Sequence, residues 1–222
     1  ITHERVIGQH SNLVKPRIDK SKAEQEKRIK EKAEVFTPSW ICNMQNNLVD
    51  NLWFSKEHIF NAEGEKSWKA TSEKTTFPKD KTWQDYVEDP RLEITCGEAP
   101  YIVSRYDTVT GDMIAVPERI GLLDRKLRIV GENTTSESDW FEHATKAYQS
   151  TYGYDWQGDN VLLARENLLI TLIDYYKQKF DKHPSEEQLL AIADIIAWNI
   201  WQMDGLKMVV PDSCLQNYKK KF

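Results

Sequence analysis

The sequence predicts a mixed α/β fold built on a doubly wound sheet. Three short apolar runs are typical of strands, and an acidic residue stands in or just after each of them. These acids are Glu93, Asp155 and Asp204. Amphipathic helical patterns separate the runs, and strands that alternate with helices indicate a parallel sheet.

The composition fits a globular domain with an extension. The chain has 222 residues, and its hydrophobic content of 40% is enough to fill a core. The formal net charge of -5 gives no overall basic bias, so the chain as a whole does not resemble a nucleic-acid-binding module. Any contact with DNA would have to be local, or be made by sequence not present here.

Cysteine and histidine show no metal-binding or disulfide pattern. Cys42, Cys96 and Cys214 are widely spaced, and the five histidines are scattered, so we expect no metal. This usage favours a reducing cytoplasm. No apolar run is long enough to span a membrane, and the first residues, which lack a Met, do not resemble a signal peptide. We expect a piece of a longer protein.

The first part of the chain, residues 1–87, is predicted to be a helical N-terminal extension, followed by the sheet-bearing domain in residues 88–222. Residues 20–32 mix basic residues with Glu and predict a solvated helix. The alternative is a basic arm that touches DNA phosphates, but the interspersed Glu residues argue against it.

A second helix is predicted to start at Thr37-Pro38, with Thr37 as the N-cap and Pro38 in the first turn. Apolar residues then follow at helical spacing, so we expect this helix to bury that face. They are Ile41, Met44, Leu48, Val49 and Leu52. Residues 55–87 have no clear period and are predicted to be an irregular connection.

The middle of the chain predicts a strand at 92–94, a turn at 107–112, and a helix at 120–130 that runs into a strand or loop. Ser138 is the predicted cap of a further helix, in which Phe141, Ala144 and Tyr148 share a face.

From Tyr152 onward the pattern is regular. A short strand leads to Asp155, and a helix is predicted over about 160–179. Ser185 and Gln188 form a capping box at the start of the next helix. Residues 199–202 are predicted to be a strand that ends at Asp204-Gly205.

The three acids are candidates for one shared site. The carboxyl ends of parallel strands converge on one crevice. Carboxylates there suit hydroxyl groups and cationic amines. Taken singly, each acid is better explained as a surface residue or a helix cap, and Asp159 competes with Asp155 for the cap. Cys96 is expected to be a small buried residue and not a nucleophile, because no histidine is near it in sequence.

Four segments, in this order, resemble the cofactor-binding part of adenine-specific DNA methyltransferases of type II restriction–modification systems. They are Phe36-Thr37-Pro38, the run Glu93-Ile94-Thr95-Cys96-Gly97-Glu98-Ala99, Asp155-Trp156, and Asn199-Ile200 with Asp204 and Leu206. The resemblance covers residues 20–208, approximately. It implies a Rossmann-like class I methyltransferase fold that binds S-adenosyl-L-methionine.

The resemblance also implies a role for each motif. Phe36-Thr37-Pro38 would fold back over the cofactor, and Glu93 would face its methionine end. Asp155 would take the ribose hydroxyls, Trp156 would pack on the adenine, and Asp204 would accept a hydrogen bond from the adenine amino group. The full implied cofactor set is Phe36, Thr37, Pro38, Glu93, Thr95, Cys96, Gly97, Asp155, Trp156, Asp204, Gly205 and Leu206.

The sequence departs from the family pattern in three places. Ala99 stands where the family has Gly, and the gap from Glu93 to Asp155 is long, so we expect an insertion within 107–147. No Pro-Pro dipeptide is present, whereas the family's catalytic motif resembles Asn-Pro-Pro-Tyr and holds a flipped adenine. We therefore expect a fold truncated before the catalytic strand, with no catalytic residue in this chain. Double-stranded DNA would be bound by parts absent here.

The resemblance implies that this chain binds the cofactor for methyl transfer to the amino group of adenine. We expect the chain alone to be inactive. The alternative is a non-catalytic scaffold or specificity subunit that binds protein or DNA. A methyltransferase that acts on RNA or protein is a third hypothesis. A sheet that stops after three strands would also expose an edge, which invites self-association.

Overall fold

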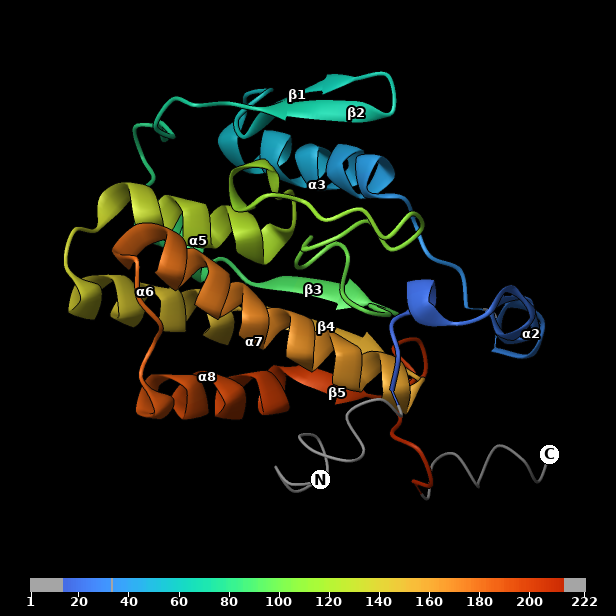
Figure 1. Ribbon diagram of the computed structural model, residues 1–222. Helices are drawn as coiled ribbons and strands as arrows, with labels where there is room; N and C mark the ends of the chain where they lie inside the picture. Colours follow the sequence, from blue (N-terminus) through green and yellow to red (C-terminus); the bar gives the residue numbers. More distant parts are fainter. Residues whose placement is uncertain (1–13, 33, 214–222) are drawn as a thin grey trace.

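The computed structural model describes residues 14–32 and 34–213 and shows a mixed α/β architecture (Figure 1). Residues 1–4, Cys214 and residues 219–222, on which some of the expectations above fall, lie outside the described residues. Within the described part of the chain, no helix is long and apolar enough to cross a membrane.

The central sheet has three parallel strands in the order β3-β4-β5. They are β3 (Arg91–Ile94), β4 (Thr151–Asp155) and β5 (Ile200–Gln202). In the register of the sheet, Glu93 lies beside Gly153, and Gly153 lies beside Ile200. The prediction of an α/β fold with a parallel sheet is therefore confirmed, and all three strands lie where the sequence places them.

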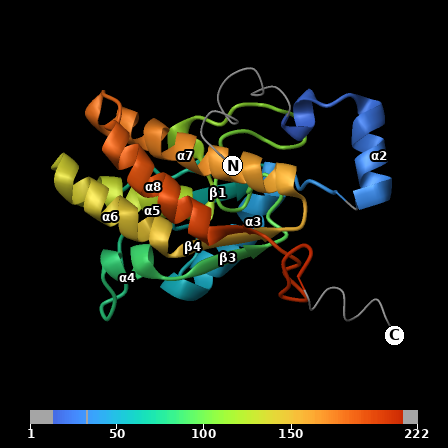
Figure 2. The same cartoon turned by 90° about the horizontal axis from the view of Figure 1, so that it is seen from below.

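Two helices follow each of the first two strands of this sheet. α5 (Leu122–Asn133) and α6 (Glu137–Gln149) connect β3 to β4, and α7 (Gly158–Phe180) and α8 (Glu186–Asn199) connect β4 to β5. Figure 2 shows α5, α6 and α8 gathered at the end of the molecule where the strands begin, and α7 extending from them along the sheet. The capping box of Ser185 and Gln188 is confirmed. The predicted cap Ser138 is wrong, because Ser136 accepts the hydrogen bond from the Asp139 amide instead.

The two faces of the sheet differ in how well they are covered. On one face, a Cβ atom placed on Gly153 would lie 3.2 Å from both Cys96 Sγ and Ile200 Cδ1, so the face is closely packed. On the opposite face, the side chains of Leu92 and Ile94 are about half-exposed. Among the described residues, β3 pairs with β4 alone, so its other edge is free. This edge is the one from which self-association is predicted, and that association stays a prediction.

The segment before the sheet holds more regular structure than the sequence suggests. It contains η1 (Arg17–Asp19), α2 (Lys22–Lys32), α3 (Ser39–Phe54), β1 (Asn61–Gly64), β2 (Ser67–Ala70) and α4 (Trp83–Glu88). β1 and β2 form an antiparallel hairpin, so the prediction of an irregular connection over 55–87 is wrong. α2 stands at one side of the molecule and is largely exposed, as predicted for a solvated helix (Figure 1). A short η2 (Val116–Glu118) precedes α5.

The predicted orientation of α3 is wrong. Its buried side chains are mostly polar, whereas Met44, Leu48 and Leu52 are exposed. The reason is a hydrogen-bonded network with α5, in which Arg125 donates to Asn43 and Asn47.

The predicted start of α3 is also displaced by one residue. Pro38, not Thr37, is the N-cap, and it makes no side-chain cap bond. The Asp107 carboxylate accepts from the Ser39 amide at 2.7 Å instead. A residue from the predicted turn at 107–112 therefore caps this helix from outside it.

Candidate functional site

A pocket of about 280 Å³ opens at the carboxyl ends of β3 and β4. Three stretches of the chain line it, from residues 34–37, from 93–101 and from 155–160. Most of the residues implied by the sequence resemblance meet here. They are Phe36, Thr37, Glu93, Thr95, Cys96, Gly97, Asp155 and Trp156.

Glu93 lies within β3 and carries a carboxylate with spare hydrogen-bonding capacity. Its Oε2 atom is shielded from solvent and has no hydrogen-bond partner. Burial, and then the nearby charge of Asp155, raise the pKa of Glu93 well above its ordinary value. The backbone amides of Ile102 and Tyr101 oppose this shift by hydrogen bonding. An acid in this state is suited to bind a cationic or hydrogen-bond-donating ligand group.

The loop after β3 turns sharply to form the wall of the pocket. Thr95, Gly97 and Ala99 all have φ near +60°, in the left-handed region that glycine favours. A Cβ atom on Gly97 would lie 3.3 Å from the Phe36 ring, so the loop and this ring are in close contact. Ala99 adopts this glycine-like conformation in spite of its side chain and is fully buried.

The segment that carries Phe36 is held over the pocket by ionic contacts. The guanidinium of Arg28 in α2 pairs with Glu34 and, at 2.7 Å, with Asp159 at the start of α7. Burial alone would raise the pKa of Glu34, but its hydrogen bonds and attraction to Arg28 lower it, so this acid is charged. Phe36 is buried, and the Arg17 guanidinium lies 5.5 Å from the centre of its ring. Pro38 does not line the pocket, because it starts α3.

Asp155 at the end of β4 joins the wall of the pocket to α7. Its carboxylate accepts hydrogen bonds from the backbone amides of Gly97 at 2.9 Å and Gln157 at 2.7 Å. Burial nevertheless raises its pKa. The Asn160 side-chain amide also donates to Oδ1 at 3.5 Å, so Oδ2, with one donor, keeps the greater capacity for a ligand. Next to it, the partly exposed Trp156 offers an aromatic surface at the mouth of the pocket.

Asp204, Gly205 and Leu206 are not among the residues that line this pocket. The Asp204 Oδ1 atom accepts from the amides of Leu206 and Lys207, and Oδ2 pairs with the Lys207 ammonium at 3.0 Å. The turn is nevertheless a neighbour of the site, since the Met203 amide donates to the Asp155 carbonyl. The cofactor contact of Asp204 stays a prediction.

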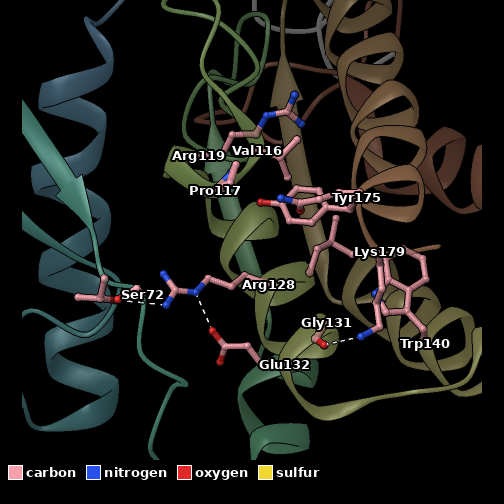
Figure 3. A pocket seen from close by; sticks show the side chains of 13 residues that line it. Ser72, Val116, Pro117, Arg119, Arg128, Gly131, Glu132, Trp140, Tyr175 and Lys179 are labelled. Atoms are coloured by element: carbon pink, nitrogen blue, oxygen red, sulfur yellow. Dashed lines mark hydrogen bonds and ion pairs between the residues drawn. The ribbon is translucent and has the colours of Figure 1, made fainter. Parts of the chain in front are cut away.

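A larger pocket of about 380 Å³ lies between α5, α6 and α7 (Figure 3). Two of its cationic side chains donate hydrogen bonds to other lining residues, whereas Arg119 Nη1 is buried without a partner. Arg128 donates to Glu132 and Thr71, and Lys179 donates to the Gly131 carbonyl (Figure 3). These bonds join the elements around the pocket, and none of the residues implied by the sequence resemblance lines it.

Sequence reasoning missed several residues of the smaller pocket, among them Glu34, Tyr101 and Asn160. Glu34 and Tyr101 are close in sequence to the recognised motifs, and this proximity could have indicated them. Asn160 had no such signal, since only the fold reveals that its amide lies 3.5 Å from Asp155 and from Arg28.

Comparison with protein-family models, curated proteins and solved structures found no match for this chain.

Proposed function

We propose that this chain is the S-adenosyl-L-methionine-binding part of an adenine-specific DNA methyltransferase of a restriction–modification system. The observation that supports it best is that three motifs of the resemblance line one pocket although up to 120 residues separate them: Phe36-Thr37, Glu93 to Gly97, and Asp155-Trp156. A parallel sheet by itself explains why the ends of β3 and β4 meet, but not why the Phe36-Thr37 segment, which lies outside the sheet, joins them.

The chemistry of the lining residues fits this cofactor. Glu93 has a shielded carboxylate oxygen without a partner, which suits the cationic amine of the methionine moiety. Asp155 Oδ2, which accepts from one donor, has capacity for a ribose hydroxyl while the bonds to both oxygens hold the carboxylate in place. Trp156 and Phe36 offer flat surfaces for the adenine. When bound, the cofactor would supply a methyl group activated by its sulfonium.

Methyl transfer by this chain alone is not part of the proposal. The sequence contains no Pro-Pro dipeptide, so we assign no residue here to holding the target adenine. Recognition of double-stranded DNA is likewise assigned to sequence outside this chain.

Isothermal titration of the full chain with S-adenosyl-L-methionine tests the proposal. Glu93→Ala and Asp155→Asn should each raise the dissociation constant about 10- to 100-fold, because each removes a charge-assisted hydrogen bond. Glu187→Ala is the matched control, since this exposed acid of α8 is remote from the pocket in the fold. Asp204→Ala shows whether the third motif takes part.

Unchanged affinity in both pocket variants would overturn the site assignment. Absence of binding by the wild-type chain, together with DNA binding that weakens steeply with salt, would favour the non-catalytic scaffold or specificity subunit.

A further inference from the structure

The larger pocket, of about 380 Å³, has one end at which unused hydrogen-bond donors gather. Gly131 of α5, Trp140 of α6 and Lys179 of α7 meet there. Figure 3 shows the Lys179 ammonium and the nitrogen edge of Trp140 on the same side of the pocket, next to Gly131. These three residues are called the donor end below.

The indole N–H of Trp140 is a donor without an acceptor. Trp140 is 1% exposed, and in the part of the chain that the structure describes its Nε1 atom makes no hydrogen bond. The ring is fixed, because it packs edge-on against Tyr176 and Phe180, with ring centres 5.5 and 6.0 Å away. A buried indole N–H usually has an acceptor, and leaving it unpaired is costly. The donor end therefore has room for an acceptor that the chain does not supply.

Lys179 gives the donor end a positive charge that no acid of the chain matches. Its ammonium donates to the Gly131 carbonyl at 2.7 Å, which leaves two of its three N–H groups for other partners. No carboxylate of the described residues forms an ion pair with it. The other cations that line the pocket, Arg119 and Arg128, are each paired with an acid. An anionic acceptor therefore suits the donor end best.

The remaining wall of the pocket is largely apolar. Val116, Pro117, Leu127 and Tyr175 line it, and the volume is within the range of sites for small molecules. Such a wall suits a ligand that has an apolar body as well as a charged group.

Gly131 keeps the donor end open. A Cβ atom at this position would approach a single atom outside its own helix within 4 Å, Trp140 Nε1 at 4.0 Å. The space beside Gly131 is therefore bounded by the indole N–H on one side and by the Lys179 ammonium on the other.

We propose that the larger pocket is a second binding site, which takes a small organic carboxylate with an apolar body. The two carboxylate oxygens accept from Lys179 and Trp140, and the body lies against Leu127 and Tyr175. A phosphate group would need donors on more than one side, whereas the donor end offers them from one side only.

This site goes beyond cofactor binding and is separate from the smaller pocket at the ends of β3 and β4. The acids Glu34, Glu93 and Asp155 line that smaller pocket, so a carboxylate is disfavoured there. The two assignments can therefore fail independently of one another.

Two-dimensional proton–nitrogen NMR of the full chain tests the proposal. The probes are phenylacetate, 3-phenylpropionate and hexanoate, each compared with its uncharged amide. At least one carboxylate should shift the Trp140 indole resonance, which is identified by its loss in Trp140→Phe, with a dissociation constant of about 1 mM. The amide of that probe should bind about 10-fold more weakly or worse, because it has no charge to pair with the ammonium.

Two variants with matched controls locate the site. Lys179→Met should raise the dissociation constant about 10-fold or more, whereas Lys177→Met, at an exposed lysine of the same helix, should leave it unchanged. Gly131→Leu fills the donor end without removing a charge and should abolish the shift. Leucine is a better helix former than glycine, so circular dichroism should show an intact fold.

The proposal would be overturned by the absence of a shift with every carboxylate up to about 20 mM. Equal affinity for the amides, or binding that survives Gly131→Leu, would overturn it as well. Glu93→Ala should leave carboxylate binding unchanged, and a loss in this variant would place the probe in the smaller pocket instead.

Discussion

Two clusters in this molecule each hold a buried acidic side chain, but they differ in how the acid is paired. Between α3 and α5, Asp50 is matched by Arg125, and Tyr86 donates to the same carboxylate at 2.8 Å. At the ends of β3 and β4, Glu93 and Asp155 lie together, and one oxygen of Glu93 has no partner. In the first cluster the buried carboxylate is paired with a cation of the chain, although Arg125 Nε has no partner, and this pairing is typical of a structural role. The second leaves capacity unused, which is typical of a binding site.

The largest expected effect comes from breaking the paired cluster. Arg125→Met would leave Asp50 buried, with Arg91 3.8 Å away as its nearest remaining cation. The free energy of unfolding should fall by about 3–5 kcal/mol, as expected for one lost partner of a buried ion pair. Urea denaturation followed by circular dichroism measures it.

The control for this substitution is Lys27→Met, which removes an exposed lysine paired with Glu31 one turn away in α2. Its cost should be at most about 1 kcal/mol. Equal losses in the two variants would show that the Asp50–Arg125 pair has no special structural role.

Lys126 differs from both clusters, because it is a buried cation whose hydrogen-bond partners include no carboxylate. Its ammonium donates to the carbonyls of Asp89 and Ser150 and to the Ser150 hydroxyl. Burial, and then repulsion from Arg91, lower the pKa of Lys126 to about 7. The folded state therefore releases this proton at a lower pH than the unfolded chain, whose lysines titrate near 10.5.

Stability should consequently rise with pH from 7 to 9, by about 2 kcal/mol for this group. Lys126→Met should remove that rise, which is measured by comparing urea unfolding of the two proteins at both pH values. A rise of the same size in Lys126→Met would show that another group causes it.

The elements that were predicted correctly from the sequence are those that depend on local signals. The strands, the helix that starts at the Ser185 capping box, and the turn at 107–112 are all encoded within a few residues of themselves. The meeting of Glu93 and Asp155 was predictable too, since parallel strands bring their carboxyl ends together.

The orientation of α3 was not predictable from its own residues. Apolar periodicity indicated which face would be buried, but distant hydrogen bonds determine the orientation of α3. Arg125, 82 positions after Asn43, donates to it, and Asp107, 68 positions after Ser39, accepts from its amide. Periodicity indicates which side chains favour burial, but it carries no information about hydrogen-bond partners that are distant in sequence. The same limit explains why the Arg28 contacts that hold Phe36 over the pocket had no sequence signal.

The smallest expected effect tests the second cluster through Glu93→Gln, which keeps the shape of the side chain and removes its ability to ionise. The pKa of Glu93 is raised, mainly by burial, so the folded protein keeps a proton that the unfolded chain has already released. Between these two pKa values, stability falls as the pH rises. Glu93→Gln should remove this fall and raise the free energy of unfolding at pH 7 by about 1 kcal/mol, measured by urea denaturation at pH 4 and pH 7.

Glu137→Gln, at an acid whose pKa is lowered by Lys182 and Tyr176, should change the free energy of unfolding with the opposite sign. A loss of stability in Glu93→Gln at pH 7 would mean that the carboxylate is already paired, and the distinction between the two clusters would fail.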